Sequence, residues 1–297
     1  NLLIQGIDDY QSGRPLLFPD AFATAFGRVL AGAASDPAFA AEVLALPPEV
    51  YIGEQRSVID PDAIHQVRQA LRRHLAERLK GELRNTYDAY QLIGPYSPDA
   101  KPAGQRSLRN LCLAYLMELN EPEGRRLCSE QLQQAGNMTD ALAALTSLAN
   151  CDCPERLPAL AAFYDKWQDE PLVVDKWLGV QAASRLPGTV DAVRQLAHHR
   201  AFDLKNPNKV YALLGSFGGN QVNFHAADGS GYSFMGEQLA ALDPINPQVA
   251  ARLARNFERW KRFDPRRQAL MKAVLEQLAA MPGLSKETAE VVTKALS

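Results

Sequence analysis

The chain of 297 residues is predicted to be all-α, a superhelical α-solenoid of antiparallel helix pairs of the irregular HEAT-like or armadillo-like kind. Three observations predict this class. Asp-Pro and Asn-Pro pairs recur just before segments with apolar periodicity, and the apolar residues in those segments repeat at helical spacing. From about residue 106 onward, segments of about 10 to 16 residues are joined by connections of about 2 to 6 residues, a pattern typical of antiparallel helix pairs.

The helix starts are marked by Asp or Asn followed by Pro. The Asp or Asn side chain can cap free backbone N–H groups, and Pro fits the first helical position because its missing N–H is not needed there. In chain order these pairs are Asp36-Pro37, Asp60-Pro61, Asn206-Pro207, Asn246-Pro247 and Asp264-Pro265. Each pair predicts that a helix begins at its Pro.

The apolar stripes predict the helices themselves. In chain order they are Phe22, Phe26, Val29 and Leu30; Ile64, Val67, Leu71, Leu75 and Leu79; Leu108, Leu111, Cys112 and Leu116; Leu142, Leu145 and Ala149; Leu157, Leu160 and Tyr164; Val174, Trp177 and Leu178; Val190, Val193 and Leu196; Val210, Leu213, Leu214 and Phe217; and Met271, Val274, Leu275 and Leu278. Gly32, Gly136 and Gly218 come just past the last apolar position of their segments and predict helix ends.

Two stretches interrupt the helical pattern. Residues 47–58, with Pro47-Pro48 and Gly53, are predicted to be a long connection. Residues 94–104 contain three prolines and predict a soft joint between a smaller N-terminal helical group and the main array. The prediction for residues 1–297 is nevertheless one continuous helical domain.

The charge balance argues against two classes of partner. The chain has 32 basic and 34 acidic residues, interspersed along its length, and a net charge of −2. A nucleic-acid-binding protein needs a clustered basic face, so no nucleic-acid partner is expected. The apolar runs are far shorter than the roughly 20 residues of a membrane helix, so we expect a soluble chain without a membrane partner.

The cysteines predict a reducing, cytoplasmic environment. Cys112 and Cys128 lie on apolar stripes, where a buried thiol is expected. Cys151 and Cys153 are separated by one residue, which matches neither a CxxC redox motif nor the usual zinc spacing. No secretory signal is visible, but the chain begins at Asn1 instead of a methionine, so we expect that a leader or whole domains precede it.

The sequence lacks the motifs of a hydrolase. It has no H-E-x-x-H, and neither His65 with His74 nor the adjacent His198-His199 has the spacing that points two imidazoles at one ion. Serine-nucleophile, phosphate-loop and dinucleotide motifs are also missing. We therefore expect this chain alone to have no catalytic residues, no metal site and no cofactor.

The segment Asn220–Tyr232, NQVNFHAADGSGY, differs from the helical pattern around it. Its glycines, with Asp228 and Ser230, predict a turn before a helix, and His225 and Tyr232 are placed to reach polar partners there. The segment is either a well-braced loop between helices or a loop whose His225, Asp228 and Tyr232 contact a ligand.

The helix that begins at Asn246 presents a second candidate surface. Val249, Leu253 and Phe257 form its apolar stripe, whereas Gln248 and Arg252 are four residues apart and share another face. We expect Arg252 in the early part of this helix, near its positive end, where carboxylates or peptide carbonyls are attracted. On the residues alone, Arg252 is either such a ligand contact or a solvated arginine.

Several runs resemble one known family. NPNKVYALLGSF (206–217), FHAADGSGY (224–232), NPQVAARL (246–253) and the ending KALS are similar to the C-terminal domain of bacterial aminopeptidase N, a family of zinc metallopeptidases. Three further segments also resemble this family: DKW at 175–177, Gln181-Ala182, and RNLCLAYL from Arg109. The resemblance covers about the last two thirds of the chain in register, and the first hundred residues fit more loosely.

The resemblance implies a hydrolase that removes N-terminal residues from peptides, with a zinc-containing catalytic domain upstream in the same polypeptide. It implies that this chain is the non-catalytic helical C-terminal domain, which caps the active site and lines a chamber for short peptides. Gln248 and Arg252 become candidate chamber-lining residues. Lys209 stands where relatives can have Arg, which leaves a role there in doubt because Lys lacks the bidentate fork.

Two other functions remain open at this point. The chain is alternatively a stand-alone α-solenoid scaffold whose concave face binds a partner helix or peptide. The third hypothesis is an independent hydrolase with a dispersed site. An H-E-x-x-H upstream of Asn1, followed about twenty residues later by a Glu, would identify the zinc enzyme.

Overall fold

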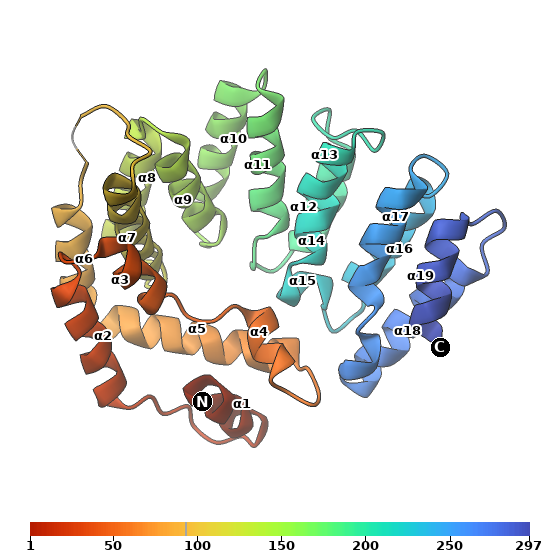
Figure 1. The fold of residues 1–297 in the computed structure, drawn as a ribbon, viewed down its shortest axis with the longest axis horizontal. Coiled ribbons are helices and arrows are strands. Elements are labelled where there is room, and N and C mark those ends of the chain that lie inside the picture. Colours follow the sequence, from red (N-terminus) through yellow and green to blue (C-terminus); the bar gives the residue numbers. More distant parts are fainter. Residues whose placement is uncertain (93) are drawn as a thin grey trace. The chain divides into compact units, whose positions relative to one another are not determined.

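The protein is all-α. The computed structural model describes residues 1–92 and 94–297, and Figure 1 shows them as a succession of helices from α1 to α19. Within that part of the chain there is no strand, only one isolated bridge between Ile59 and Phe263. The helices fall into two compact units, residues 1–52 with 63–162 and residues 53–62 with 163–297. Within each unit, helices pack on helices close to them in the chain, such as α8 on α9 and α11 on α12, so the predicted all-α, solenoid-like class is confirmed.

The first unit is organised around the long helix α7. Its helices are α1 (Leu2–Gln11), α2 (Asp20–Gly32), α3 (Pro37–Leu44), most of α5 (Pro61–Arg78), α6 (Lys80–Ala89), α7 (Ala100–Met117), α8 (Pro122–Gln134), α9 (Met138–Ala149) and the first part of α10 (Arg156–Trp167). Helix α7 packs against α3, α6, α8 and α9. Gly104 permits a close contact between α7 and α3, because a Cβ there would lie 2.9 Å from the backbone nitrogen of Ala38.

The second unit contains α11 (Pro171–Ala182), α12 (Thr189–Ala197), α13 (Pro207–Val210), α14 (Ser216–Gly218), α15 (Gln221–Phe224), α16 (Ser230–Leu242), α17 (Pro247–Ala254), α18 (Pro265–Ala279) and α19 (Lys286–Leu296). Helix α19 packs on α17 and α18, and α16 packs on the same two helices. The core of the second unit contains an aromatic cluster of five side chains that are each at most 1% exposed: Phe217, Phe224, Tyr232, Phe234 and Phe257. This cluster holds the candidate loop 220–232 against the helices on either side.

The helix that begins at Asn206 is not regular. Between α13 and α14 the backbone forms a π-helical turn over Tyr211–Gly215. Such turns insert extra backbone into a helix and are frequent at functional sites. Here the turn places the Tyr211 ring beside one of the candidate side chains described below.

The predicted helix starts are confirmed. The side chains of Asp36, Asn206, Asn246 and Asp264 each accept a backbone N–H of the helix that follows, at 3.0–3.2 Å. Helix α5 likewise begins at Pro61. Local capping chemistry therefore decides where these helices begin.

Both stretches that were predicted to interrupt the helical pattern contain helix. Residues 47–58 include the short helix α4 (Glu49–Glu54), so the prediction of a plain connection there was wrong. Helix α7 begins at Ala100, so the last part of the predicted joint at 94–104 is helical, with Pro102 in its first turn, where Pro is tolerated. The joint lies inside the first unit, and the prediction of one domain over 1–297 stays a prediction.

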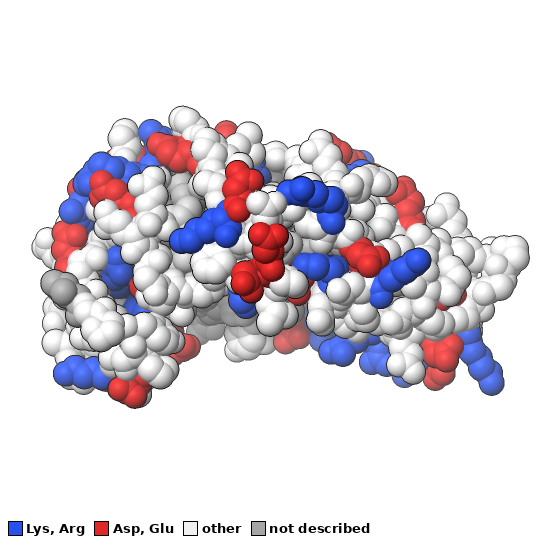
Figure 2. Space-filling view, turned by 90° about the horizontal axis from the view of Figure 1, so that it is seen from above, with Lys and Arg blue, Asp and Glu red and all other residues white. Residues whose placement is uncertain are grey.

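The surface carries mixed charge. On the face shown in Figure 2, basic and acidic side chains are interspersed without a large patch of one sign. Among the described helices, none combines the length and apolar character needed to cross a membrane. All four cysteines are free thiols, and Cys112, Cys128 and Cys151 are buried.

Candidate functional site

Helix α17 presents the candidate face as the sequence predicts. Asn246 caps its start, and Val249 and Leu253 turn inward, being 7% and 4% exposed. Gln248 and Arg252 lie on the opposite, solvent-exposed side. The spacing of four residues therefore places both side chains on one face of the helix, as expected.

Gln248 and Arg252 line a shallow depression between α17 and α19. Its volume is about 570 Å³, and Ala251, Arg255, Glu287, Glu290 and Val291 complete the lining. The Arg252 guanidinium lies over the Tyr211 ring, 5.4 Å from the ring centroid. A cation at this distance from a ring face is attracted to it, so the π-helical turn helps to hold Arg252 in place.

The expected position of Arg252 near the positive end of its helix was wrong. Helix α17 ends at Ala254 and continues as a 3-10 turn, Arg255–Phe257, so Arg252 lies in the last turn. The partial charge at that end of a helix is negative. Any attraction of carboxylates to this face must therefore come from the side chains of Arg252 and Arg255 themselves.

The depression combines both signs of charge. Arg252 and Arg255 face Glu287 and Glu290, which lie three residues apart on one side of α19. Guanidinium, carboxylate and amide groups can together bind the carbonyls, amides and charged ends of a short peptide. Sequence reasoning did not identify Glu287 and Glu290 as site residues. Their spacing of three residues indicates that they share one face of a helix, but nothing in the sequence indicates that this face lies against α17.

Lys209 is buried instead of facing a ligand. Only 9% of it is exposed, and its Nζ lies 2.8 Å from Oδ1 of Asp175 and donates to the carbonyl oxygen of Pro171 at 3.1 Å. Both partners belong to α11. The structure therefore places Lys209 in a link between α13 and α11, away from Arg252's depression.

His225 and Tyr232 pair with each other in the core. His225 is 4% exposed and Tyr232 is fully buried, and the Nδ1 of His225 lies 2.9 Å from the Tyr232 hydroxyl. The imidazole stacks on Phe263 with 4.3 Å between ring centroids. Burial, with a smaller contribution from the positive charge of Arg267, lowers the pKa of His225 to about 3. These positions favour the hypothesis that His225 and Tyr232 brace the loop.

Of the three candidate residues in this loop, Asp228 is the exposed one. Its Oδ1 accepts the Ser230 backbone N–H at 2.9 Å and the Ser230 hydroxyl at 2.7 Å, and these bonds hold the pKa of Asp228 below its usual value. Gly229 follows with φ of 80°, a conformation that favours glycine. Asp228 and Gly229 thus form the turn that leads into α16.

Comparison with known proteins identifies the family. The family described as "Domain of unknown function (DUF3458_C) ARM repeats" matches residues 1–297. Aminopeptidase N of Escherichia coli (strain K12) is 43% identical over 290 residues, which cover 97% of this chain and 33% of that protein. Aminopeptidase N of Haemophilus influenzae is 37% identical over 288 residues, again 97% of this chain and 33% of the relative. The chain thus spans about a third of the length of these relatives.

A solved structure agrees with the sequence comparison. The crystal structure of Legionella pneumophila aminopeptidase A in complex with aspartic acid superimposes with a TM-score of 0.91 at 30% identity, covering 99% of this chain and 35% of that one. The resemblance expected from the runs NPNKVYALLGSF, FHAADGSGY and NPQVAARL is confirmed, and it extends over the first hundred residues as well. The chain belongs to the DUF3458_C family of ARM-repeat domains and is similar to the C-terminal domain of aminopeptidase N.

Proposed function

We propose that this chain is the non-catalytic helical domain of a zinc-dependent aminopeptidase that removes N-terminal residues from peptides. The observation that carries the proposal is the similarity of nearly the whole chain to about one third of aminopeptidase N. In this proposal the remaining part of the same polypeptide contains the catalytic domain. The helical domain caps the active site and forms part of the wall of the substrate chamber.

The zinc ion belongs, in this proposal, to the catalytic domain. Across residues 1–92 and 94–297, no three His, Cys, Asp or Glu side chains gather as metal ligands. A zinc peptidase needs three protein ligands and an open position for water. The donor set of the described residues does not fit such a site, so we assign no catalytic step to them. The free cysteines support a cytoplasmic location for the enzyme.

The first test concerns the chain on its own. Purified residues 1–297 are expected to bind no stoichiometric zinc and to release no product from an aminoacyl arylamide. Metal analysis and a chromogenic assay measure both. One equivalent of bound zinc, or turnover that survives repurification, would contradict the non-catalytic assignment. The coding sequence upstream of Asn1 separates the two functions: if it has no H-E-x-x-H, a scaffold that binds a partner helix or peptide is favoured instead.

The second test concerns Arg252. In the full-length enzyme, Arg252→Ala should raise KM for tri- and tetrapeptides about tenfold, because it removes a charge-assisted hydrogen bond of roughly 1.5 kcal/mol. Gln248→Ala should have the same direction and a smaller effect, since its hydrogen bonds are neutral. Steady-state kinetics on peptides of two to four residues measure both changes.

Two controls separate binding from structure. A small arylamide that does not reach this wall should be processed almost normally by the Arg252 variant. Arg266→Ala, which removes another exposed arginine of the same unit, should leave all substrates unaffected. Equal loss with peptides and arylamide, or a lower melting temperature in the Arg252 variant, would assign Arg252 to structure.

A further inference from the structure

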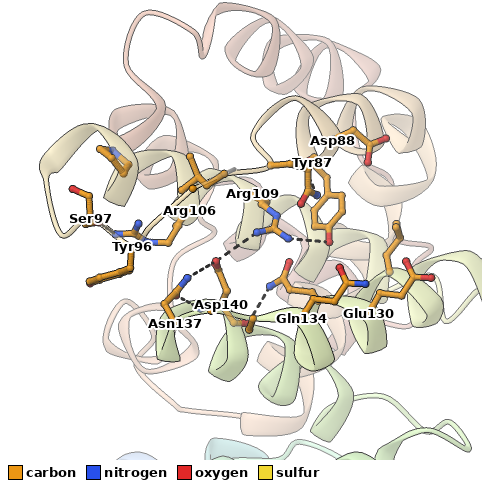
Figure 3. A pocket seen from close by; sticks show the side chains of 18 of the residues that line it. Tyr87, Asp88, Tyr96, Ser97, Arg106, Arg109, Glu130, Gln134, Asn137 and Asp140 are labelled. Atoms are coloured by element: carbon orange, nitrogen blue, oxygen red, sulfur yellow. Dashed lines mark hydrogen bonds and ion pairs between the residues drawn. The ribbon is translucent and has the colours of Figure 1, made fainter.

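A second pocket lies wholly within the first unit. It is formed by α6, α7, α8, the start of α9 and residues 94–97, and its volume is about 610 Å³ (Figure 3). This volume is in the range of sites for small molecules, roughly 300–1,000 Å³. The pocket contains none of the candidate site residues discussed above, so its function is a separate question.

Two buried arginines of α7 form the inner wall of this pocket. Arg106 and Arg109 are 4% and 8% exposed. The Arg106 guanidinium donates to the Ser97 carbonyl oxygen at 2.8 Å and lies over the Tyr96 ring. The Arg109 guanidinium donates to the Tyr87 hydroxyl at 3.4 Å and lies 3.5 Å from Oδ2 of Asp140. In both residues the Nε–H is buried without a hydrogen-bond acceptor in the described structure.

The carboxylate at this wall is largely committed to other donors. Asp140 accepts the side-chain amides of Asn110 and Asn137, each at 2.9 Å, and its contact with Arg109 is longer than either. At the rim, Arg84 pairs with Asp88 at 2.7 Å and Arg126 pairs with Glu130 at 2.8 Å, so these rim charges compensate one another. Within the described part of the chain, Arg106 has no carboxylate partner.

The inner wall therefore holds two buried cations and one carboxylate. Burying a charge is costly unless an opposite charge and hydrogen bonds compensate for it. The backbone N–H groups at the start of α9, which follow Asn137, add partial positive charge to the same pocket. A negatively charged ligand in the pocket would balance this excess positive charge.

We propose that this pocket binds a small oxyanion, a carboxylate or phosphate group, through Arg106 and Arg109. Guanidinium groups favour planar or tetrahedral oxyanions because their donors form a fixed fork. The rings of Tyr87 and Tyr96, which also line the pocket, stack on the two guanidiniums and hold their orientation. Gln134, an exposed amide at the pocket wall in Figure 3, is placed to donate an additional hydrogen bond.

The test uses calorimetric titration of the purified protein with inorganic phosphate and, separately, with succinate, at a constant ionic strength set by sodium chloride. We expect saturable binding of at least one of the two, and competition between them identifies the preferred class of oxyanion. If neither binds saturably, the proposal is wrong.

Gln134→Glu provides a variant that should fold. It adds a carboxylate at the pocket wall with almost no change in shape, so it should raise the Kd of the oxyanion at least tenfold. Gln133→Glu makes the same change on the same helix at an exposed residue that does not line the pocket, and its Kd should equal that of the unchanged protein. Equal weakening by both variants would show a general charge effect and overturn the proposal.

Arg106→Gln tests the buried donor directly. With its helical circular dichroism intact, this variant should lose at least tenfold in affinity for the oxyanion, whereas Arg73→Gln, an exposed arginine paired with Glu77, should bind normally. Unchanged binding by a folded Arg106 variant contradicts the proposal. If the variant does not fold, the comparison of Gln134→Glu with Gln133→Glu decides the question.

Discussion

Arg267→Ala is expected to lower the free energy of unfolding of the second unit by about 3–4 kcal/mol. Arg267 is 5% exposed and donates to Asp62 at 2.7 Å, to Asp264 at 2.9 Å and to the His225 carbonyl oxygen at 2.7 Å. Asp62 is about half exposed and water can replace its lost partner, but the His225 carbonyl oxygen cannot recover a donor in the core. The cost is therefore mainly that of a buried carbonyl acceptor left without a donor. The partly buried carboxylate of Asp264 keeps only the backbone N–H of residue 267.

Tryptophan fluorescence during urea unfolding measures the free energy of unfolding of the second unit. The three tryptophans, Trp167, Trp177 and Trp260, all belong to the second unit. Arg266→Ala removes the neighbouring exposed arginine and should change the free energy of unfolding by less than about 0.5 kcal/mol. If the two alanine variants unfold at the same urea concentration, the network around Arg267 does not stabilise the fold.

The helix starts could be predicted because they depend on neighbours in the sequence. Asn246 and Asp264 cap their helices through hydrogen bonds to residues three positions further on, and such pairs can be recognised from the sequence alone. The same holds for the face shared by Gln248 and Arg252, which follows from helical periodicity. Local rules were sufficient for these features.

The end of α17 and the long-range pairs could not be predicted in this way, although α2 and α14 do end at Gly32 and Gly218 as predicted. Helix α17 ends at Ala254 although its apolar stripe continues to Phe257, which stays buried in a 3-10 turn. The spacing of apolar residues cannot distinguish an α-helix that continues to Phe257 from an α-helix that ends at Ala254 and is followed by a 3-10 turn. The pair of Arg267 with Asp62 joins residues 205 positions apart, and in the sequence Asp62 is only an acidic residue in the first turn of α5.

The oxyanion pocket shows the same limit. Arg106 and Arg109 are three residues apart in a helix that also carries Lys101 and Ser107, and arginines in such a setting are usually solvated. Their burial results from α6, α8 and α9 packing around α7, together with the residues that precede α7. Only tertiary structure brings Asp140 and Tyr87 to these guanidiniums, so the sequence contained no local signal for the pocket.

His225 is expected to make the second unit sensitive to acid. Burial, aided by the charge of Arg267, lowers the pKa of His225 to about 3 in the folded protein, whereas its ordinary value of 6.5 applies to the unfolded chain. Between these two values the unfolded chain binds a proton that the folded protein does not. Stability from this residue is therefore present at neutral pH and is lost as the pH falls below 6.5 toward 3, by about 2.5 kcal/mol between pH 7 and pH 4.5.

A comparison of variants isolates this effect from the titration of carboxylates. His225→Gln should be less stable than the unchanged protein at pH 7, because the stacking on Phe263 and the bond to the Tyr232 hydroxyl are disturbed. The difference in unfolding free energy between the two should shrink by about 2.5 kcal/mol at pH 4.5, since only the unchanged protein loses the contribution of a neutral, buried imidazole. His198→Gln, at an exposed histidine of the same unit, should follow the pH dependence of the unchanged protein. A difference between the His225 variant and the unchanged protein that stays constant from pH 7 to 4.5 would show that His225 accepts a proton in the folded state as readily as in the unfolded chain.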